Sequence, residues 1–103
     1  MYRNEKYRRL VASLPCAHCG REGRSQAAHS NLAMHGKGMG IKASDAAIFP
    51  LCADDFAANG CHFRFDQHQL FDSKAEEIDA THRFIANTMM KLLEQGYLTI
   101  KNH

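Results

Sequence analysis

Four cysteines in a chain of 103 residues are the feature that most constrains the fold. Only two residues separate Cys16 from Cys19, so both thiolates can take corners of a tetrahedron around Zn²⁺, with Zn–S distances of about 2.3 Å. Gly20 follows, and its freedom to adopt positive φ exposes backbone N–H groups to the sulfurs. Cys52 and Cys61 are available for the other two corners. We therefore predict a closed, structural zinc site that holds the fold and does no chemistry.

Three alternatives to this ligand set stay open at the level of sequence. The cysteines could be free buried thiols, or Cys16 and Cys19 could form a redox pair, although the βαβ pattern typical of such pairs is absent. His18 or His62 could replace one cysteine. The eight residues between the last two cysteines, 53–60, are interpreted as an insertion that bulges out between two ligands.

Chain length and polarity indicate a single small domain that spans residues 1–103. A chain of this size buries roughly 60–65% of its unfolded surface, and a metal cross-link commonly compensates for the small core. The first nine residues are charged and lack an apolar signal region, and the longest nearly apolar run, 46–53, is too short to span a membrane. We therefore expect a cytoplasmic protein, where cysteines more often bind metal than form disulfides.

Periodicity and capping residues predict an α+β fold with an N-terminal helix and a long C-terminal helix. The predicted elements, in chain order, are helix 4–14, strand 25–31, flexible loop 34–40, strand 46–52, helix 61–71, a helix from about 73 to 95 and strand 97–101. Asn4 is the expected N-cap of the first helix, Ser73 or Asp72 that of the last, and Gly96 the expected C-terminal cap. The predicted apolar stripe of the last helix is Ile78, Ile85, Met89, Leu92 and Leu93.

Charge is distributed unevenly along the chain, although the net charge is only +2. Residues 1–42 carry eight Lys/Arg and two Glu, a net charge of +6, whereas residues 43–103 carry five Lys/Arg and nine Asp/Glu, a net charge of −4. A basic first half suits a polyanionic partner such as DNA. The alternative is an accidental asymmetry of a solvated surface.

Three further residues form a candidate active site. His29 lies on the first predicted strand, and His62 and Asp66 are four residues apart on a predicted helix, which places them on one helix face. An imidazole and a carboxylate in that arrangement can share one divalent cation, while a second histidine can serve as a general base near neutral pH. Taken alone, a histidine on a strand is also typical of a structural residue, and a His–Asp pair four residues apart on a helix is also typical of a surface contact.

The order of these residues resembles the HNH, or ββα-metal, nucleases of the treble-clef kind, and most closely the small phage and prophage HNH nucleases. The resemblance rests on Cys16-x-x-Cys19, His29 in Ala-Ala-His-Ser, the Gly-x-Gly-x-Lys-x-x-Asp segment at 38–45, and Cys61-His-Phe-Arg-Phe-Asp66. It implies a zinc-stapled treble-clef/ββα-metal fold over nearly the whole chain.

The resemblance also implies roles for the candidate site residues. His29 corresponds to the general base, and Asp45 stands where the family has a residue that orients it. His62 and Asp66 correspond to ligands of a catalytic divalent cation. Lys37 and Lys42 are positioned to touch phosphate.

Two functions are therefore expected at this stage, and geometry distinguishes them. The first is a divalent-metal-dependent DNA endonuclease, with Mg²⁺ favoured because Ala28 stands where many members have a further ligand, and Mg²⁺ keeps several waters. The alternative is a non-catalytic zinc module that binds DNA or a phage or host recombination protein. The enzyme requires His29 to converge with His62 and Asp66 on one cleft.

Overall fold

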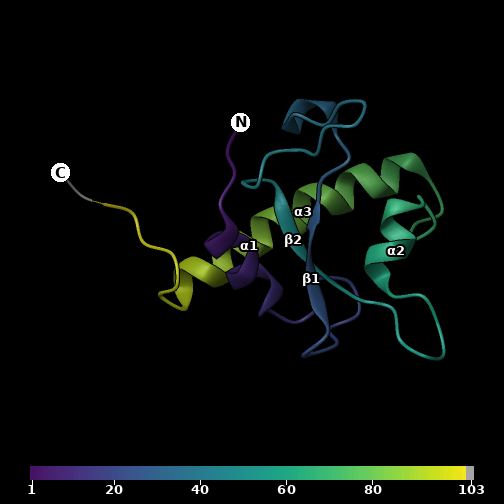
Figure 1. Cartoon of the computed structure of the whole chain (residues 1–103), viewed down its shortest axis with the longest axis horizontal. Helices are drawn as coiled ribbons and strands as arrows, with labels where there is room; N and C mark the ends of the chain where they lie inside the picture. The colour runs from purple at the N-terminus through teal and green to yellow at the C-terminus, as the bar shows by residue number, and fades with distance from the viewer. Residues whose placement is uncertain (102–103) are drawn as a thin grey trace.

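A computed structural model describes residues 1–101 as a small α+β protein, which confirms the predicted fold class. Its elements are α1 (Glu5–Ala12), β1 (Ser25–His29), the 3₁₀ turn η1 (Ala33–His35), β2 (Ile48–Cys52), α2 (Cys61–Asp66) and α3 (Lys74–Glu94). In Figure 1, α3 runs behind the two strands, with α1 and α2 toward opposite ends of the molecule. No helix within these residues has the length and apolarity that crossing a membrane requires.

β1 and β2 form a two-stranded antiparallel sheet in which Ser25 pairs with Cys52 and His29 with Ile48. Every residue of β2 is buried, because helices pack against both of its faces. β1 pairs on one side only, and its polar residues Gln26 and His29 remain accessible. The sheet therefore leaves one strand edge free to carry functional side chains.

Alternation along β2 divides the apolar core into two parts. Phe49 and Leu51 pack in the larger cluster, where Phe49 lies 5.3 Å from the ring centroids of both Phe65 and Phe84. Ile48 packs in the smaller cluster with residues of α1 and Leu92 of α3. The larger cluster contains Cys16, Cys52 and Cys61, so the cysteines are part of the core.

The predicted N-caps of α1 and α3 are confirmed. Asn4 Oδ1 accepts from the Tyr7 amide at 2.9 Å, and Ser73 Oγ accepts from the Glu76 amide at 3.1 Å. Both bonds satisfy N–H groups that have no partner within the helix.

The prediction of a terminal strand at 97–101 is wrong. Gly96 adopts a φ of +78°, and the amides of Tyr97 and Leu98 both bond to the carbonyl of Leu92, which folds the chain back over the end of α3. Leu98 then packs against the smaller core cluster instead of pairing in a sheet.

α2 is also shorter than the predicted helix 61–71. It ends at Asp66 because His68 adopts a φ of +57° and turns the chain away from the helical path. Leu70 and Phe71 then pack against the larger core cluster as a loop. His62 and Asp66 both remain within the helix, so their predicted shared face is retained.

Candidate metal centre and candidate active site

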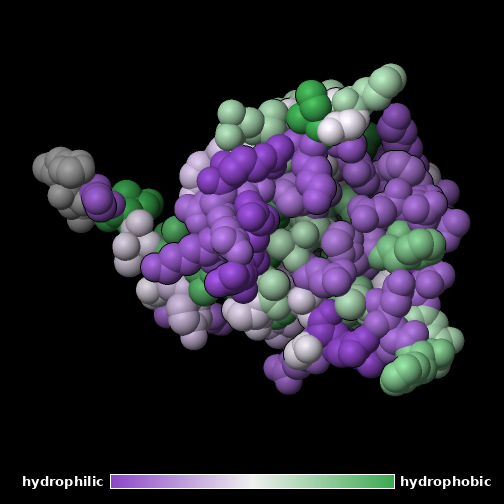
Figure 2. Space-filling view, in the orientation of Figure 1, coloured by the Kyte–Doolittle hydropathy of each residue, from purple (hydrophilic) through white to green (hydrophobic). Residues whose placement is uncertain are grey.

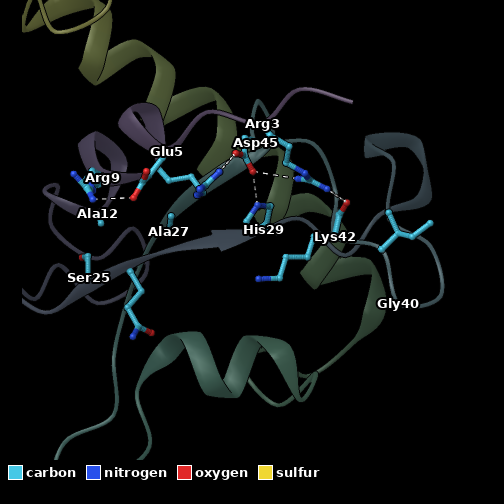
Figure 3. A pocket seen from close by; sticks show the side chains of 13 residues that line it. Arg3, Glu5, Arg9, Ala12, Ser25, Ala27, His29, Gly40, Lys42 and Asp45 are labelled. Carbon is cyan, nitrogen blue, oxygen red and sulfur yellow. Dashed lines mark hydrogen bonds and ion pairs between the residues drawn. The ribbon is translucent and has the colours of Figure 1, made fainter.

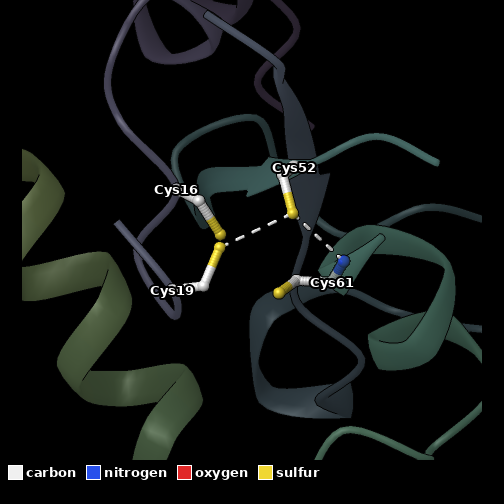
Figure 4. Close-up of side chains that lie close together, drawn as sticks. All are labelled: Cys16, Cys19, Cys52 and Cys61. Atoms are coloured by element: carbon white, nitrogen blue, oxygen red, sulfur yellow. Dashed lines mark hydrogen bonds between the residues drawn. The ribbon is translucent and has the colours of Figure 1, made fainter. Parts of the chain in front are cut away.

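The four cysteine sulfurs lie within 4.8 Å of one another and form a candidate metal centre (Figure 4). The sulfurs of Cys19 and Cys52 are 3.8 Å apart. In a tetrahedral zinc site with Zn–S bonds of about 2.3 Å, neighbouring sulfurs lie about 3.8 Å apart. All four cysteines are free thiols, and three of them are buried. The cluster therefore fits a structural metal such as zinc.

Backbone donors support the anionic form of the Cys16 thiol. Burial raises the pKa of Cys16, but backbone N–H groups of Cys19, Cys52 and His18 outweigh this effect and lower the pKa to about 7. The Cys61 amide donates to the sulfur of Cys52 at 3.3 Å. Burial raises the pKa of Cys61, so a bound cation would be needed to hold all four sulfurs as thiolates.

The residues 53–60 bulge outward between Cys52 and Cys61, as predicted, and Gly60 closes the bulge. A Cβ atom at Gly60 would lie 2.4 Å from the carbonyl oxygens of both Cys52 and Ala53. Because Gly60 has no side chain, the two ends of the bulge can approach each other. Cys52 and Cys61, nine positions apart in sequence, therefore lie close together. Asp54 Oδ1 accepts from the Gly60 amide at 2.7 Å and fastens this contact.

Within residues 1–101, neither histidine that could have replaced a cysteine belongs to the cluster of sulfurs. The His18 ring lies 5.5 Å from the Phe71 centroid, in an edge contact with the core. His62 bonds to Gln26 and faces Asp66 instead. The ligand set that the geometry favours is therefore the four-cysteine set.

The second site is built around a buried carboxylate that holds His29 (Figure 3). Asp45 Oδ1 lies 2.7 Å from His29 Nε2, and the Asp45 side chain is 1% exposed. Since a carboxylate accepts, Nε2 carries the proton, and Nδ1 is left as the acceptor nitrogen. Nδ1 makes no hydrogen bond to any group within residues 1–101. The contact with Asp45 thus sets the orientation and the tautomer of the His29 ring.

The negative charge of Asp45 is stabilised by donors from the N-terminal segment. Oδ2 accepts from the Asn4 amide at 2.7 Å and from the Arg8 guanidinium, and Oδ1 accepts from Arg3 Nη1 at 3.1 Å. Burial raises the pKa of Asp45, but the bonds from Asn4, His29, Arg8 and Arg3 together hold it well below its ordinary value of 3.8. Asp45 therefore stays ionised at every pH near neutrality.

His62 and Asp66 face each other on α2, as their spacing predicts. His62 Nε2 lies 3.4 Å from Asp66 Oδ2, and His62 Nδ1 lies 2.7 Å from Gln26 Oε1. Because an amide oxygen only accepts, Nδ1 carries the proton and the lone pair of Nε2 is directed toward the carboxylate. Two acceptors that face each other call for a positive charge between them, either a proton or a metal ion.

One cleft of about 300 Å³ brings these groups together. Its lining includes Ala27, His29, Lys37, Lys42, His62 and Asp66. The predicted base, the predicted cation ligands and the two predicted phosphate contacts thus share one surface depression.

A larger groove of about 870 Å³ continues from the cleft toward α1. It shares Ala27, His29 and Lys42 with the cleft and adds the cationic side chains of Arg3, Arg8 and Arg9 (Figure 3). The basic first half of the sequence is therefore concentrated beside His29.

Sequence reasoning missed three residues of this site: Arg3, Arg8 and Gln26. The two arginines lie about forty residues before their partner Asp45 in sequence, so no local spacing marks the contact. Gln26 carried no such signal either, because residues three apart on a strand, such as Gln26 and His29, are expected on opposite faces. Its partner, His62, lies 36 residues further along the chain and reaches Gln26 only because α2 packs beside β1.

The fold and these two clusters define a small α+β protein with a four-cysteine metal site and a separate histidine–carboxylate cleft. A family model described as "Protein of unknown function (DUF968)" matches residues 1–91, and the chain belongs to this family. No curated protein and no solved structure matches the chain.

Proposed function

We propose that this protein is a divalent-metal-dependent DNA endonuclease of the HNH type, with a structural zinc on the four cysteines. The observation that carries the proposal is the single cleft that joins His29, His62 and Asp66 with two lysines. Hydrolysis of a phosphodiester needs a base for water, a cation for the developing charge and stabilisation of the leaving oxygen. The cleft offers a residue type for each of these tasks.

His29 is the proposed general base. Its Nδ1 accepts a proton from water, and the imidazolium that forms is stabilised through Nε2 by the carboxylate of Asp45, 2.7 Å away. Arg3 and Arg8 keep Asp45 ionised, so the carboxylate orients the ring without taking its proton. Lys37 and Lys42 hold phosphate oxygens of the substrate at the wall of the cleft.

His62 and Asp66 are the proposed ligands of the catalytic cation. Two ligand atoms at right angles, each about 2.1 Å from Mg²⁺, lie about 3.0 Å apart, and Nε2 and Oδ2 are within a few tenths of an ångström of that separation. When bound, the cation would neutralise charge on the phosphate and stabilise the leaving 3′-oxygen. Gln26 orients His62 as an outer hydrogen-bond acceptor, an arrangement typical of metal-binding histidines.

The order β1, β2, α2 also supports the finer fold assignment. In the proposed ββα-metal arrangement, the base lies on the first strand and the cation ligands on the helix that follows the second. Cys61 begins that helix and belongs to the cysteine cluster, so the treble-clef zinc site would fix the position of the catalytic helix.

The test is incubation of purified protein with supercoiled plasmid and with single-stranded DNA across Mg²⁺, Mn²⁺ and Zn²⁺. We expect cleavage that requires a divalent cation. Asp66→Ala should abolish it at low metal concentration and recover part of it at high concentration, because His62 remains as a ligand. Asp79→Ala, which changes an exposed carboxylate on α3, is the matched control and should cut normally. Wild-type protein that cuts no DNA with any cation would leave the non-catalytic zinc module as the better account.

A further inference from the structure

The loop after β1 ends in a tight, closed turn that displays one apolar side chain. The amide of Gly38 donates to the carbonyl of Ile41, and the amide of Ile41 donates to the carbonyl of Gly38, both at 3.1 Å. Met39, at the second position of this turn, is fully exposed. Gly40, at the third position, has a φ of +68°, which type II turns require of that residue. Reciprocal bonds of this kind make the turn a rigid unit.

Contacts at the base of the loop hold the turn in place relative to β1. The Ser44 amide donates to the carbonyl of His35 at 2.9 Å, and the His35 ring bonds to the buried hydroxyl of Ser30 at 2.6 Å. Arg3 donates to the carbonyl of Lys42 at 2.7 Å and ties the opposite side of the loop to the N-terminal segment. The loop expected to be flexible is therefore anchored on both sides.

Positive charge flanks the turn on both sides. Lys37 and Lys42 immediately precede and follow residues 38–41, and both line the cleft that holds His29. Figure 2 shows apolar atoms gathered over this loop at the top of the molecule. The exposed apolar side chains of the loop are Met34, Met39 and Ile41.

A second exposed apolar tip lacks this excess of positive charge. Phe56, in the bulge between Cys52 and Cys61, is fully exposed but follows Asp54 and Asp55 directly. Arg21 pairs with Asp55, and Arg24 bonds to the carbonyl of Asp54, so the charges at that tip largely cancel. The lysines beside Met39, in contrast, favour a polyanion. Methionine is enriched and lysine depleted at protein–protein interfaces, so the two flanking lysines are the feature that favours DNA over a protein partner.

We propose that residues 38–41 form a wedge that enters the minor groove of duplex DNA beside the scissile phosphate. Met39 inserts between two base pairs and unstacks them, while Lys37 and Lys42 contact phosphates on either side. Apolar side chains, methionine among them, kink duplexes in this way when proteins bind the minor groove. The inference rests on the proposed nuclease function and names its substrate class: duplex DNA, preferentially at steps that unstack easily, such as pyrimidine–purine steps or mismatches.

The test measures unstacking directly in the full-length, zinc-loaded protein without added divalent cation. A duplex with 2-aminopurine at a central position becomes brighter when that base is unstacked. We expect wild-type protein to raise the fluorescence and Met39→Ala to bind the duplex about tenfold more weakly without the rise, because the buried thioether side chain is lost. Met39→Leu should restore most of both effects. Phe56→Ala is the matched control and should match the wild type.

The outcomes separate the wedge from the nuclease. If Met39→Ala binds and brightens the duplex as the wild type does, the wedge is wrong, and continued plasmid cleavage leaves the nuclease standing. Equal losses of affinity for single-stranded and duplex DNA would also overturn the wedge, since a single strand offers no base-pair step to open. If the wild type neither binds nor cuts DNA, both proposals fail together.

Discussion

Replacement of Asp45 by Asn tests how strongly the site is tied to the fold. The carboxylate is buried and accepts from four groups: the Asn4 amide, His29, Arg3 and Arg8. Breaking a buried ion pair costs about 3–5 kcal/mol. The side chains of Arg3 and Arg8 are 42% and 36% exposed, so water can rehydrate them. We therefore expect Asp45→Asn to lower the free energy of unfolding by about 2–3 kcal/mol at neutral pH.

The pH dependence of this loss follows from the direction of the pKa shift. The fold lowers the pKa of Asp45, so its contribution is complete above the unfolded value of 3.8 and declines only as the pH falls below that value. Titration of Asp45 itself should therefore leave the difference between wild type and Asp45→Asn unchanged from about pH 5.5 to about pH 8.

Urea denaturation of the zinc-loaded proteins, followed by circular dichroism, measures the loss. Asp79→Asn is the matched control, because this carboxylate is 73% exposed and pairs with Arg83 one helical turn away. It should lose at most a few tenths of a kcal/mol. A loss for Asp45→Asn that is no larger than the control's, or one that grows between neutral and mildly alkaline pH, would refute the reasoning.

Three further predictions follow from the two sites. Elemental analysis should find about one zinc per chain, and Cys16→Ser should unfold the protein, since site binding is coupled to folding; a folded, zinc-free variant would contradict this. Gln26→Ala should weaken Mn²⁺ binding about 10–100-fold by calorimetry without changing the fold, because His62 loses its orienting partner; unchanged affinity would exclude that role. Neutralising Lys37 and Lys42 together should reduce the salt slope of DNA binding by nearly two, and an unchanged slope would place the phosphates elsewhere.

Sequence patterns predicted the parts of this fold that depend on local chemistry. The cysteine spacing anticipated the cluster, the capping residues anticipated three helix ends, and the spacing of His62 and Asp66 anticipated their contact. The caps and the pair of His62 and Asp66 act on residues only a few positions away. Cysteine is a rare residue type with few alternative roles in a small protein.

Patterns that depend on tertiary packing were less informative. The predicted stripe on α3 included Met89 and Leu93, which are 40% and 41% exposed, whereas the helix buries Thr81, Phe84 and Thr88. The two threonines satisfy their hydroxyls by bonding to carbonyls one turn earlier, so a polar residue can face the core with no buried hydroxyl left unpaired. Hydropathy alone therefore placed the buried face one position away from where it lies.

At the candidate active site, the contacts of Asp45 also depend on tertiary packing that the sequence pattern does not reveal. The resemblance to HNH nucleases indicated Asp45 as a partner for His29, and the structure places the two side chains in contact. The ion pairs with Arg3 and Arg8 join segments about forty residues apart, and many carboxylates in the chain could have met those arginines. Only the docking of α1 against the sheet selects this one.

The central claim is that His29 transfers a proton in DNA cleavage, and the rate of plasmid cleavage by His29→Ala tests it most directly. We expect a loss of about 10²–10⁴-fold, with zinc content and duplex affinity close to those of the wild type and a smaller loss of stability than Asp45→Asn causes. Added imidazole should restore part of the rate, whereas added Mg²⁺ should not. Cleavage at the wild-type rate, or a variant that loses its zinc and unfolds, would contradict the assignment of His29 as the general base.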